Sequence, residues 1–165
     1  MIMESNVRKM VLSIFVDNTF GVLSRVAGLF SRRGYNIDSL TVGTTEDPKY
    51  SRMTVVATGD EQILTQIKKQ VEKLEDVREV KELVPSSSVY RELILVKIRC
   101  KAEQRQAVIS ISEIFRAKIV DVTPDSLTAE LTGDQDKLEA FLKLLEDYKI
   151  LEIARTGITG LSRGR

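Results

Sequence analysis

Three observations predict that this sequence of 165 residues folds as α+β, in two similar halves. The order strand–helix–strand–strand–helix–strand can be traced twice along the chain. A polar segment, Pro-Ser-Ser-Ser at 85–88, separates the two passes. The second helix of each half opens with the same Thr-Gly-Asp triplet, at 58–60 and at 132–134. We therefore expect two small domains, 1–84 and 91–165, joined by a linker over 85–90.

The first half opens with a strand and a helix. Apolar residues alternate over 9–17, which is the period of a strand with one buried face. Between Val22 and Phe30 the apolar residues recur at the spacing of one buried helix face. Gly34 follows this helix and is expected to end it in a left-handed conformation. The rest of the half comprises β-rich runs and a helix capped by Asp60. The runs span 37–44, 50–58 and 77–84.

The second half repeats this order. Its expected strands are 93–101, 118–123, 126–132 and 150–158, and its expected helices are 103–115 and 136–145. The fold class is therefore two ferredoxin-like βαββαβ domains in tandem, each with an antiparallel sheet and two helices on one face. The other face of the first sheet is expected to include Val11, Phe15 and Ile37, which are too apolar to face water. We expect a second copy or a partner to cover that face or its edge strand, so the protein should not be a monomer.

Composition excludes several classes of function. The formal net charge is +1 with no basic cluster, which argues against a nucleic-acid binder. The sequence has no histidine, the commonest general base and metal ligand. Its single cysteine, Cys100, falls in phase with the apolar strand residues Ile94, Val96 and Ile98, so we expect a buried thiol without a metal or disulfide. We find neither a signal peptide nor a membrane-spanning run and expect a cytoplasmic protein.

The turn after the first strand holds the best candidate for a binding site. The first turn of a helix presents unpaired N–H groups, here around residues 21–23, and Gly21 lets a ligand come close. Asn18 before the helix and Asn36 after it offer amide groups that donate and accept. Each residue alone is ordinary in a turn, but the equivalent turn at 101–105 lacks both the glycine and the asparagine. With no nucleophile, acid–base pair or metal cluster, the arrangement suits holding a small zwitterion such as an amino acid.

The stretch from Asn18 to Val42 resembles the small regulatory subunit of acetohydroxyacid synthase (acetolactate synthase), whose amino-terminal half is an ACT domain. Three segments of the second half add to this resemblance: 113–116 (Glu-Ile-Phe-Arg), 119–122 (Ile-Val-Asp-Val) and 155–157 (Arg-Thr-Gly). The resemblance implies a subunit without chemistry of its own. Such a subunit stimulates a thiamine-diphosphate-dependent catalytic subunit of branched-chain amino-acid biosynthesis and confers feedback inhibition by valine or a related amino acid.

The resemblance also implies a homodimer formed through ACT domains, with effector sites where the two domains meet. One chain would supply the first five residues and the other chain the last two of the set Asn18, Gly21, Val22, Leu23, Ser24, Asn36 and Ile37. No cofactor is expected in this subunit. Thiamine diphosphate, Mg and FAD are expected only in the catalytic partner.

Three other functions stay open at this point. RNA-recognition domains share the strand order but stack bases on aromatic residues of the central strands, and 52–56 offers none. A small enzyme of acylphosphatase type has the same topology, although no phosphate-cradling loop is evident. A free-standing tandem ACT-type amino-acid sensor with another target would share the binding turn. Copurification with a thiamine-diphosphate enzyme would distinguish a regulatory subunit from such a sensor.

Overall fold

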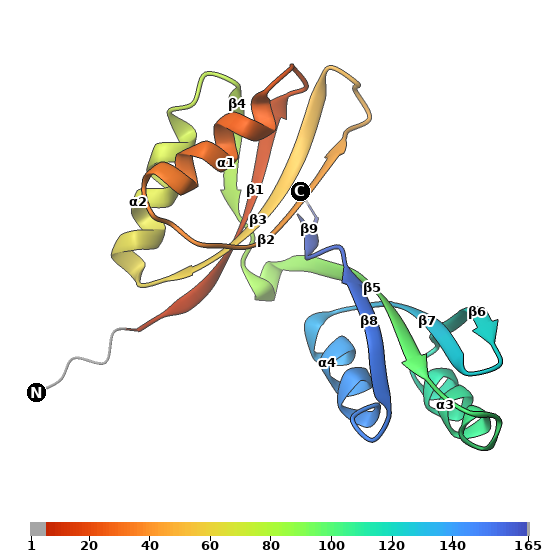
Figure 1. The fold of residues 1–165 in the computed structure, drawn as a ribbon. Helices are drawn as coiled ribbons and strands as arrows, with labels where there is room; N and C mark the ends of the chain where they lie inside the picture. Colours follow the sequence, from red (N-terminus) through yellow and green to blue (C-terminus); the bar gives the residue numbers. More distant parts are fainter. Residues whose placement is uncertain (1–5, 165) are drawn as a thin grey trace, which may run out of the picture. The chain divides into compact units, whose positions relative to one another are not determined.

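The computed structural model describes residues 6–164, and residues 1–5 and 165 of the two expected domains lie outside this range. Contacts divide the chain into two compact units. The first unit comprises Met1–Val89 together with Ile158–Arg165, and the second unit comprises Tyr90–Gly157. The second unit is thus inserted between two segments of the first (Figure 1).

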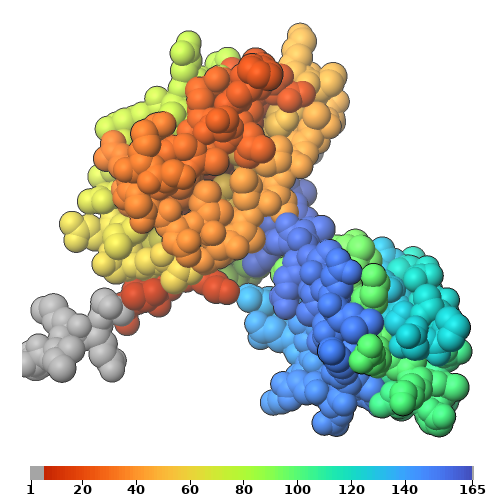
Figure 2. Space-filling model, viewed as in Figure 1, coloured from red at the N-terminus to blue at the C-terminus, as the bar shows by residue number. Residues whose placement is uncertain are grey.

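The first unit has the predicted βαββαβ order. Its elements are β1 (Arg8–Asp17), α1 (Val22–Arg32), β2 (Ile37–Thr44), β3 (Tyr50–Gly59), α2 (Glu61–Glu72) and β4 (Val77–Glu82). The strands form an antiparallel sheet in the order β2-β3-β1-β4, with Leu12 opposite Val55 in its centre. A short 3-10 helix, η1 (Pro85–Ser87), follows. In Figure 2 the orange and yellow atoms of α1 and α2 form a continuous layer on this unit.

The second unit repeats the topology, which confirms the predicted fold class. Its elements are β5 (Ser88–Arg99), α3 (Ala102–Ile114), β6 (Lys118–Thr123), β7 (Ser126–Gly133), α4 (Gln135–Leu144) and β8 (Lys149–Arg155). The sheet has the equivalent order β6-β7-β5-β8. The first two residues of β5 are counted with the first unit.

The helix boundaries follow from local chemistry. The carboxylate of Asp60 accepts a hydrogen bond from the Ile63 N–H at 2.8 Å and caps α2, as predicted. Asp134 does the same for α4, accepting from the Lys137 N–H at 2.9 Å. Gly34 has the predicted left-handed conformation, with φ of 68° just after α1. The repeated Thr-Gly-Asp triplet therefore marks an aspartate-capped helix start in both units.

Each unit has its own hydrophobic core between its sheet and its two helices. The largest fully buried side chain is Phe30 of α1 in the first core and Phe141 of α4 in the second. Cys100 is fully buried in the second core, as predicted. Among the described residues, no helix is both long enough and apolar enough to cross a membrane.

The end of the chain differs from the sequence-based expectation of one strand over 150–158. Strand β8 ends at Arg155, and a separate strand, β9 (Thr159–Ser162), follows and pairs with β5. The break occurs because Gly157 adopts a left-handed conformation with φ of 84°, which a β-strand cannot contain. The expected linker differs too, since 85–90 holds η1 and the beginning of β5.

The helix-free face of the first sheet also differs from expectation. Val11 and Phe15 lie on it, opposite Val56 and Arg52, but Ile37 does not. Ile37 stands opposite the core residue Ala57, and its side chain packs against the core. The alternation was misread there because the β2–β3 register shifts between Ile37 and Ser39.

Candidate functional site

The predicted turn joins β1 to α1 and is fixed by backbone hydrogen bonds. The Asn18 N–H donates to the Lys49 carbonyl at 2.8 Å, and its Nδ2 donates to the Pro48 carbonyl at 3.0 Å. The turn is thereby tied to the β2–β3 connection. The Asn18 Oδ1 accepts no hydrogen bond from the part of the chain that the structure describes. Its acceptor is therefore available to an ammonium group.

Backbone donors are open at the start of α1. Gly21 precedes the helix in a left-handed conformation with φ of 82°, and no side chain caps the helix. The prediction placed free N–H groups at Gly21, Val22 and Leu23, but the Val22 N–H contacts the Thr19 carbonyl at 3.3 Å. Within residues 6–164 the N–H groups of Gly21, Leu23 and Ser24 have no partner. The helix start therefore favours an anionic group, because it also has no acidic residue in its first turn.

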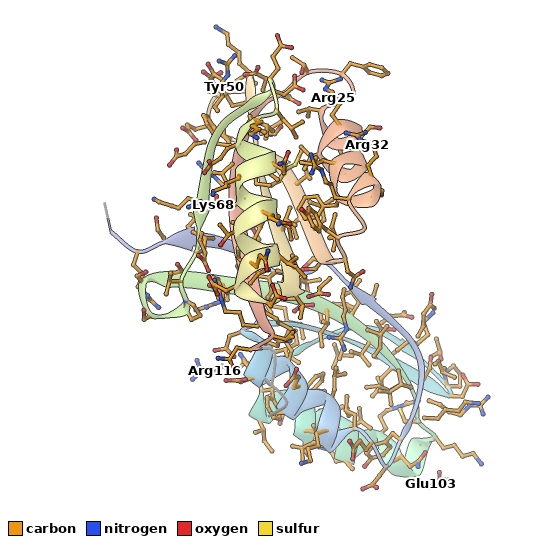
Figure 3. The ribbon with its side chains drawn as sticks, turned by 90° about the vertical axis from the view of Figure 1, so that its left-hand side faces the viewer. Arg25, Arg32, Tyr50, Lys68, Glu103 and Arg116 are labelled. Atoms are coloured by element: carbon orange, nitrogen blue, oxygen red, sulfur yellow. The ribbon has the colours of Figure 1, made fainter. Side chains whose placement is uncertain are left out.

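Arg25 adds a cation that sequence reasoning did not single out. Its Nε donates to Asp76 Oδ2 at 2.5 Å and its Nη2 donates to the Phe20 carbonyl at 3.2 Å. A Cβ on Gly21 would lie 2.9 Å from Arg25 Nη1, so the guanidinium lies directly beside the glycine. Figure 3 shows Arg25 at the beginning of α1, with Arg32 farther along the helix. The sequence signal that could have identified Arg25 is a long cationic side chain one helical turn after a glycine.

Asp76 holds this guanidinium in place. Its other carboxylate oxygen accepts a hydrogen bond from the Thr19 hydroxyl at 3.4 Å. The hydrogen bond from Arg25 lowers the pKa of the Asp76 carboxyl below its ordinary value. The same interaction raises the pKa of Arg25, so the pair stays ionised at neutral pH. The cation is therefore positioned next to the open backbone donors.

The apolar side chains of the predicted site have different exposures. Val22 is only 7% exposed and belongs to the core, and Ile37 packs against the same core. Leu23 is 44% exposed, and Phe20 before the helix is fully exposed. Ser24 is exposed as well. Of the predicted apolar residues, Leu23 thus has the most surface to offer an aliphatic ligand.

The structure does not bring the two asparagine turns together within one chain. Asn18 and Gly21 lie before α1, whereas Asn36 and Ile37 follow it. An 11-residue helix is about 16 Å long, too far for a ligand of amino-acid size to bridge. Asn36 donates from Nδ2 to Asp38 Oδ1 at 3.2 Å. A site that uses both turns therefore needs a second copy of the unit.

Strand β2 offers a surface for such a copy. It stands at the edge of the sheet, and among the described residues it pairs only with β3. Its outer N–H and C=O groups are therefore open, and Val42 on this strand is half exposed.

Other hollows of the first unit lie away from the predicted site. One is lined by Asn6, Val7 and Arg8 together with the first residues of α2, and another lies between Arg8, Lys68 and Glu82. Arg8 bridges Glu61 and Glu82 there, at 2.8 and 2.7 Å. Neither hollow contains a predicted site residue. Residues 6–164 also contain no group of three or more histidine, cysteine or acidic side chains arranged to hold a metal ion.

Comparison with known protein families gives two matches that together span most of the chain. Residues 12–79 match the family described as the AHAS small subunit-like ACT domain. Residues 91–164 match the family described as the small subunit of acetolactate synthase.

Individual relatives agree with these matches. The chain is 51% identical over 155 residues to the probable acetolactate synthase small subunit of Methanothermobacter thermautotrophicus, covering 93% of this chain and 92% of that protein. It is 52% identical over 155 residues to the acetolactate synthase isozyme 3 small subunit of Escherichia coli, covering 93% and 95%. The crystal structure of the acetolactate synthase small subunit from Thermotoga maritima superposes with a TM-score of 0.87 at 42% identity, covering 96% and 99%.

Proposed function

The chain belongs to the family of acetolactate synthase small subunits, and on this premise we propose that it confers feedback inhibition by a branched-chain amino acid, chiefly valine. As a regulatory subunit it would stimulate a separate thiamine-diphosphate-dependent catalytic subunit. Thiamine diphosphate, Mg and FAD would bind that partner. The family and the ACT domain support a regulatory subunit directly, and the effector and its site are the proposed part.

One observation carries the proposed effector site: three backbone donors and a guanidinium surround Gly21, and no carboxylate caps the helix. The effector's carboxylate would bind the N–H groups of Leu23 and Ser24, with Arg25 beside it. Asn18 Oδ1 would accept a hydrogen bond from the effector's ammonium group. The aliphatic side chain would contact Leu23, since the Val22 side chain is buried in the core.

A second chain would complete this site. If the open edges of β2 pair across a dimer, Asn36 at the beginning of one β2 can reach the α1 start of the other chain. Binding in such a seam would depend on how the two chains are arranged, and so it could alter the surface presented to the catalytic subunit. A coupling free energy of about 1–3 kcal/mol is typical of such linkage and is enough for useful feedback.

Titration calorimetry of the purified chain with valine, leucine and isoleucine tests the binding part. We expect graded affinities, because one methylene in an apolar pocket changes the binding free energy by about 1–3 kcal/mol. Assay of the holoenzyme reconstituted with a catalytic subunit tests the regulatory part. A chain that stimulates the catalytic subunit but binds none of the three amino acids would refute the effector site while leaving the regulatory role.

The alternative is a free-standing amino-acid sensor that regulates a different target, because an ACT domain alone does not determine which protein it regulates. The match of residues 91–164 to the same small-subunit family favours the catalytic subunit of acetolactate synthase over another target. Failure to copurify with that catalytic subunit would favour the alternative.

A further inference from the structure

The last segment of the chain crosses the helix-free face of the first sheet. Thr41 on β2 donates from Oγ1 to the Ile158 carbonyl at 3.2 Å. The Gly160 N–H contacts Thr54 Oγ1 on β3 at 3.4 Å. Further along the segment, Lys81 on β4 donates from Nζ to Ser162 Oγ at 3.2 Å. We call residues 158–163 the C-terminal strap.

These contacts follow the order of the strands, so the strap runs across the sheet and not along its edge. β2 and β4 are its two outer strands, with β3 and β1 between them. Three strand spacings are roughly 14 Å, and four residues of extended chain span about 13 Å. The strap therefore spans nearly the full width of the sheet, and the side chains of Thr41 and Lys81 reach its two ends. The Arg163 N–H then donates to the Ser87 carbonyl at 2.7 Å.

The strap crosses the sheet over one row of residues, because Thr41, Thr54, Ser13 and Lys81 stand opposite one another on adjacent strands. Ser13 and Thr54 in this row are each only 2% exposed, although no helix covers them. Farther along the same face, Phe15 is only partly buried, with the Arg52 guanidinium 5.2 Å from its ring centroid.

The strap is held by its pairing with β5 and by polar contacts, and it contributes little to a core. Of its two large apolar side chains, Leu161 is 60% exposed and Ile158 is partly buried, and its buried residue, Gly160, has no side chain. Gly157 and Gly164 on either side adopt left-handed conformations, which allow the chain to turn away from the sheet. A segment with few buried apolar contacts opens more readily than the strands beneath it.

We propose that the strap is a releasable cover of the ACT sheet, and that effector binding holds it down. This second part rests on the proposed function. Asn36, which would reach the effector bound at the other chain, directly precedes β2, and Thr41 on this strand anchors the strap. The strap continues directly from the end of the second unit, so a change at β2 would reach the second unit through the chain itself.

Cysteine labelling tests the cover. In Ser13→Cys the thiol would lie under the strap, whereas in Val55→Cys it would lie in the core on the opposite face. The native Cys100 is fully buried, and the unmodified chain measures its background. We expect deletion of 158–165 to raise the labelling rate of Ser13→Cys at least tenfold and to leave that of Val55→Cys unchanged. An unchanged rate at position 13, or an equal rise at both positions, would overturn the proposal.

The same Ser13→Cys chain, assembled with the catalytic subunit, tests the link to the effector. We expect saturating valine to slow labelling severalfold, and Thr41→Val to abolish that effect. Thr44→Val, an exposed position on the same strand, should keep it. Valine binding in calorimetry with no change in labelling would overturn the link and leave the proposed function standing. If none of valine, leucine and isoleucine bound, both the proposed effector site and the link would be overturned, while the deletion result still decides whether the strap is a cover.

Discussion

Helix α1 follows β1 and helix α3 follows β5, at equivalent places in two copies of one topology. The residue before α1 is Gly21, and the first turn of α1 has no acidic residue. The residue before α3 is Lys101, whose N–H donates to Gln104 Oε1 at 3.1 Å, and Glu103 lies in the first turn. The second helix start thus carries a carboxylate in its first turn and is partly capped within the chain, which makes it a poorer site for an anion.

An arginine stands four residues after the N-cap of the first helix in both units, yet the two arginines contact different groups. Arg25 contacts the Asp76 carboxylate beside Gly21, whereas Arg105 donates to the carbonyls of Thr123 and Pro124. The fold therefore permits a binding site at this turn without requiring one. The residues at the N-cap and in the first turn determine whether the site exists.

The largest effect is expected in the cores. Phe30→Ala and Phe141→Ala each remove a fully buried ring and should lower the free energy of unfolding by about 3–5 kcal/mol. Because each unit has its own core, hydrogen exchange should show lost protection in the mutated unit only. If Phe141→Ala reduced protection equally in β1 and β3, the two units would unfold together and the comparison would need revision.

Gly21→Asp is the most direct test of the difference between the two helix starts. It adds a carboxylate at the proposed anion site and a Cβ 2.9 Å from Arg25 Nη1, in a backbone conformation that favours glycine. We expect valine affinity to fall at least about a hundredfold, or about 2.8 kcal/mol, with stimulation of the catalytic subunit retained. Gly21→Ala carries the same backbone strain without the charge and should lose less affinity. Full valine sensitivity of Gly21→Asp would rule out the site.

Arg25→Met and Arg105→Met form a matched pair. Removing the guanidinium beside Gly21 should weaken valine binding by about tenfold, or about 1.4 kcal/mol, measured by calorimetry. Arg105→Met should leave valine affinity unchanged, since Arg105 contacts backbone carbonyls of the second unit. Equal effects of the two substitutions would show that Arg25 has no direct role in binding.

The helix caps should instead behave alike in the two units. Asp60→Ala and Asp134→Ala each remove one side-chain acceptor from a helix start. Each should cost about 1 kcal/mol in denaturant unfolding, and neither should alter valine affinity. A cost confined to one unit would indicate that the repeated triplet is not structurally equivalent.

The smallest effect is expected from the Arg25–Asp76 pair as the pH falls. Because folding lowers the pKa of Asp76, its stabilising effect is present above its unfolded pKa of about 3.9 and is lost as pH falls through the folded value. Asp76→Asn should therefore be slightly less stable at neutral pH and show a shallower loss of stability in acid. If Asp76→Asn and the unmodified chain lost stability equally as the pH fell, the stabilising role of the Arg25–Asp76 pair would be contradicted.

Periodicity and capping residues were enough to predict the elements of both units in order. Strand spacing of apolar residues located β1, and the Thr-Gly-Asp triplets located the starts of α2 and α4. The turn at Asn18 and Gly21 could also be found from sequence, because an uncapped helix start has a recognisable composition. These features depend on residues that are close together in the chain.

What could not be predicted depends on distant residues. Asp76, the partner of Arg25, lies 51 positions away and nothing local distinguishes it from other surface acids. The register shift that turns Ile37 toward the core is a property of the β2–β3 pairing. Strand β9 has the sequence Thr-Gly-Leu-Ser, without the alternation of a strand, and its position is fixed by pairing with β5 and by contacts with β2 and β3.

The strap has a consequence for biosynthesis on the ribosome. The first sheet is complete once Glu82 has been made, but its cover is translated only after the whole second unit. At about 5–20 residues per second, the 68 residues of the second unit, Tyr90–Gly157, delay that cover by roughly 3–14 s. During this interval Ser13 and Thr54 lack that cover on the nascent chain. The uncovered face is then a natural contact for a chaperone, or for another nascent subunit.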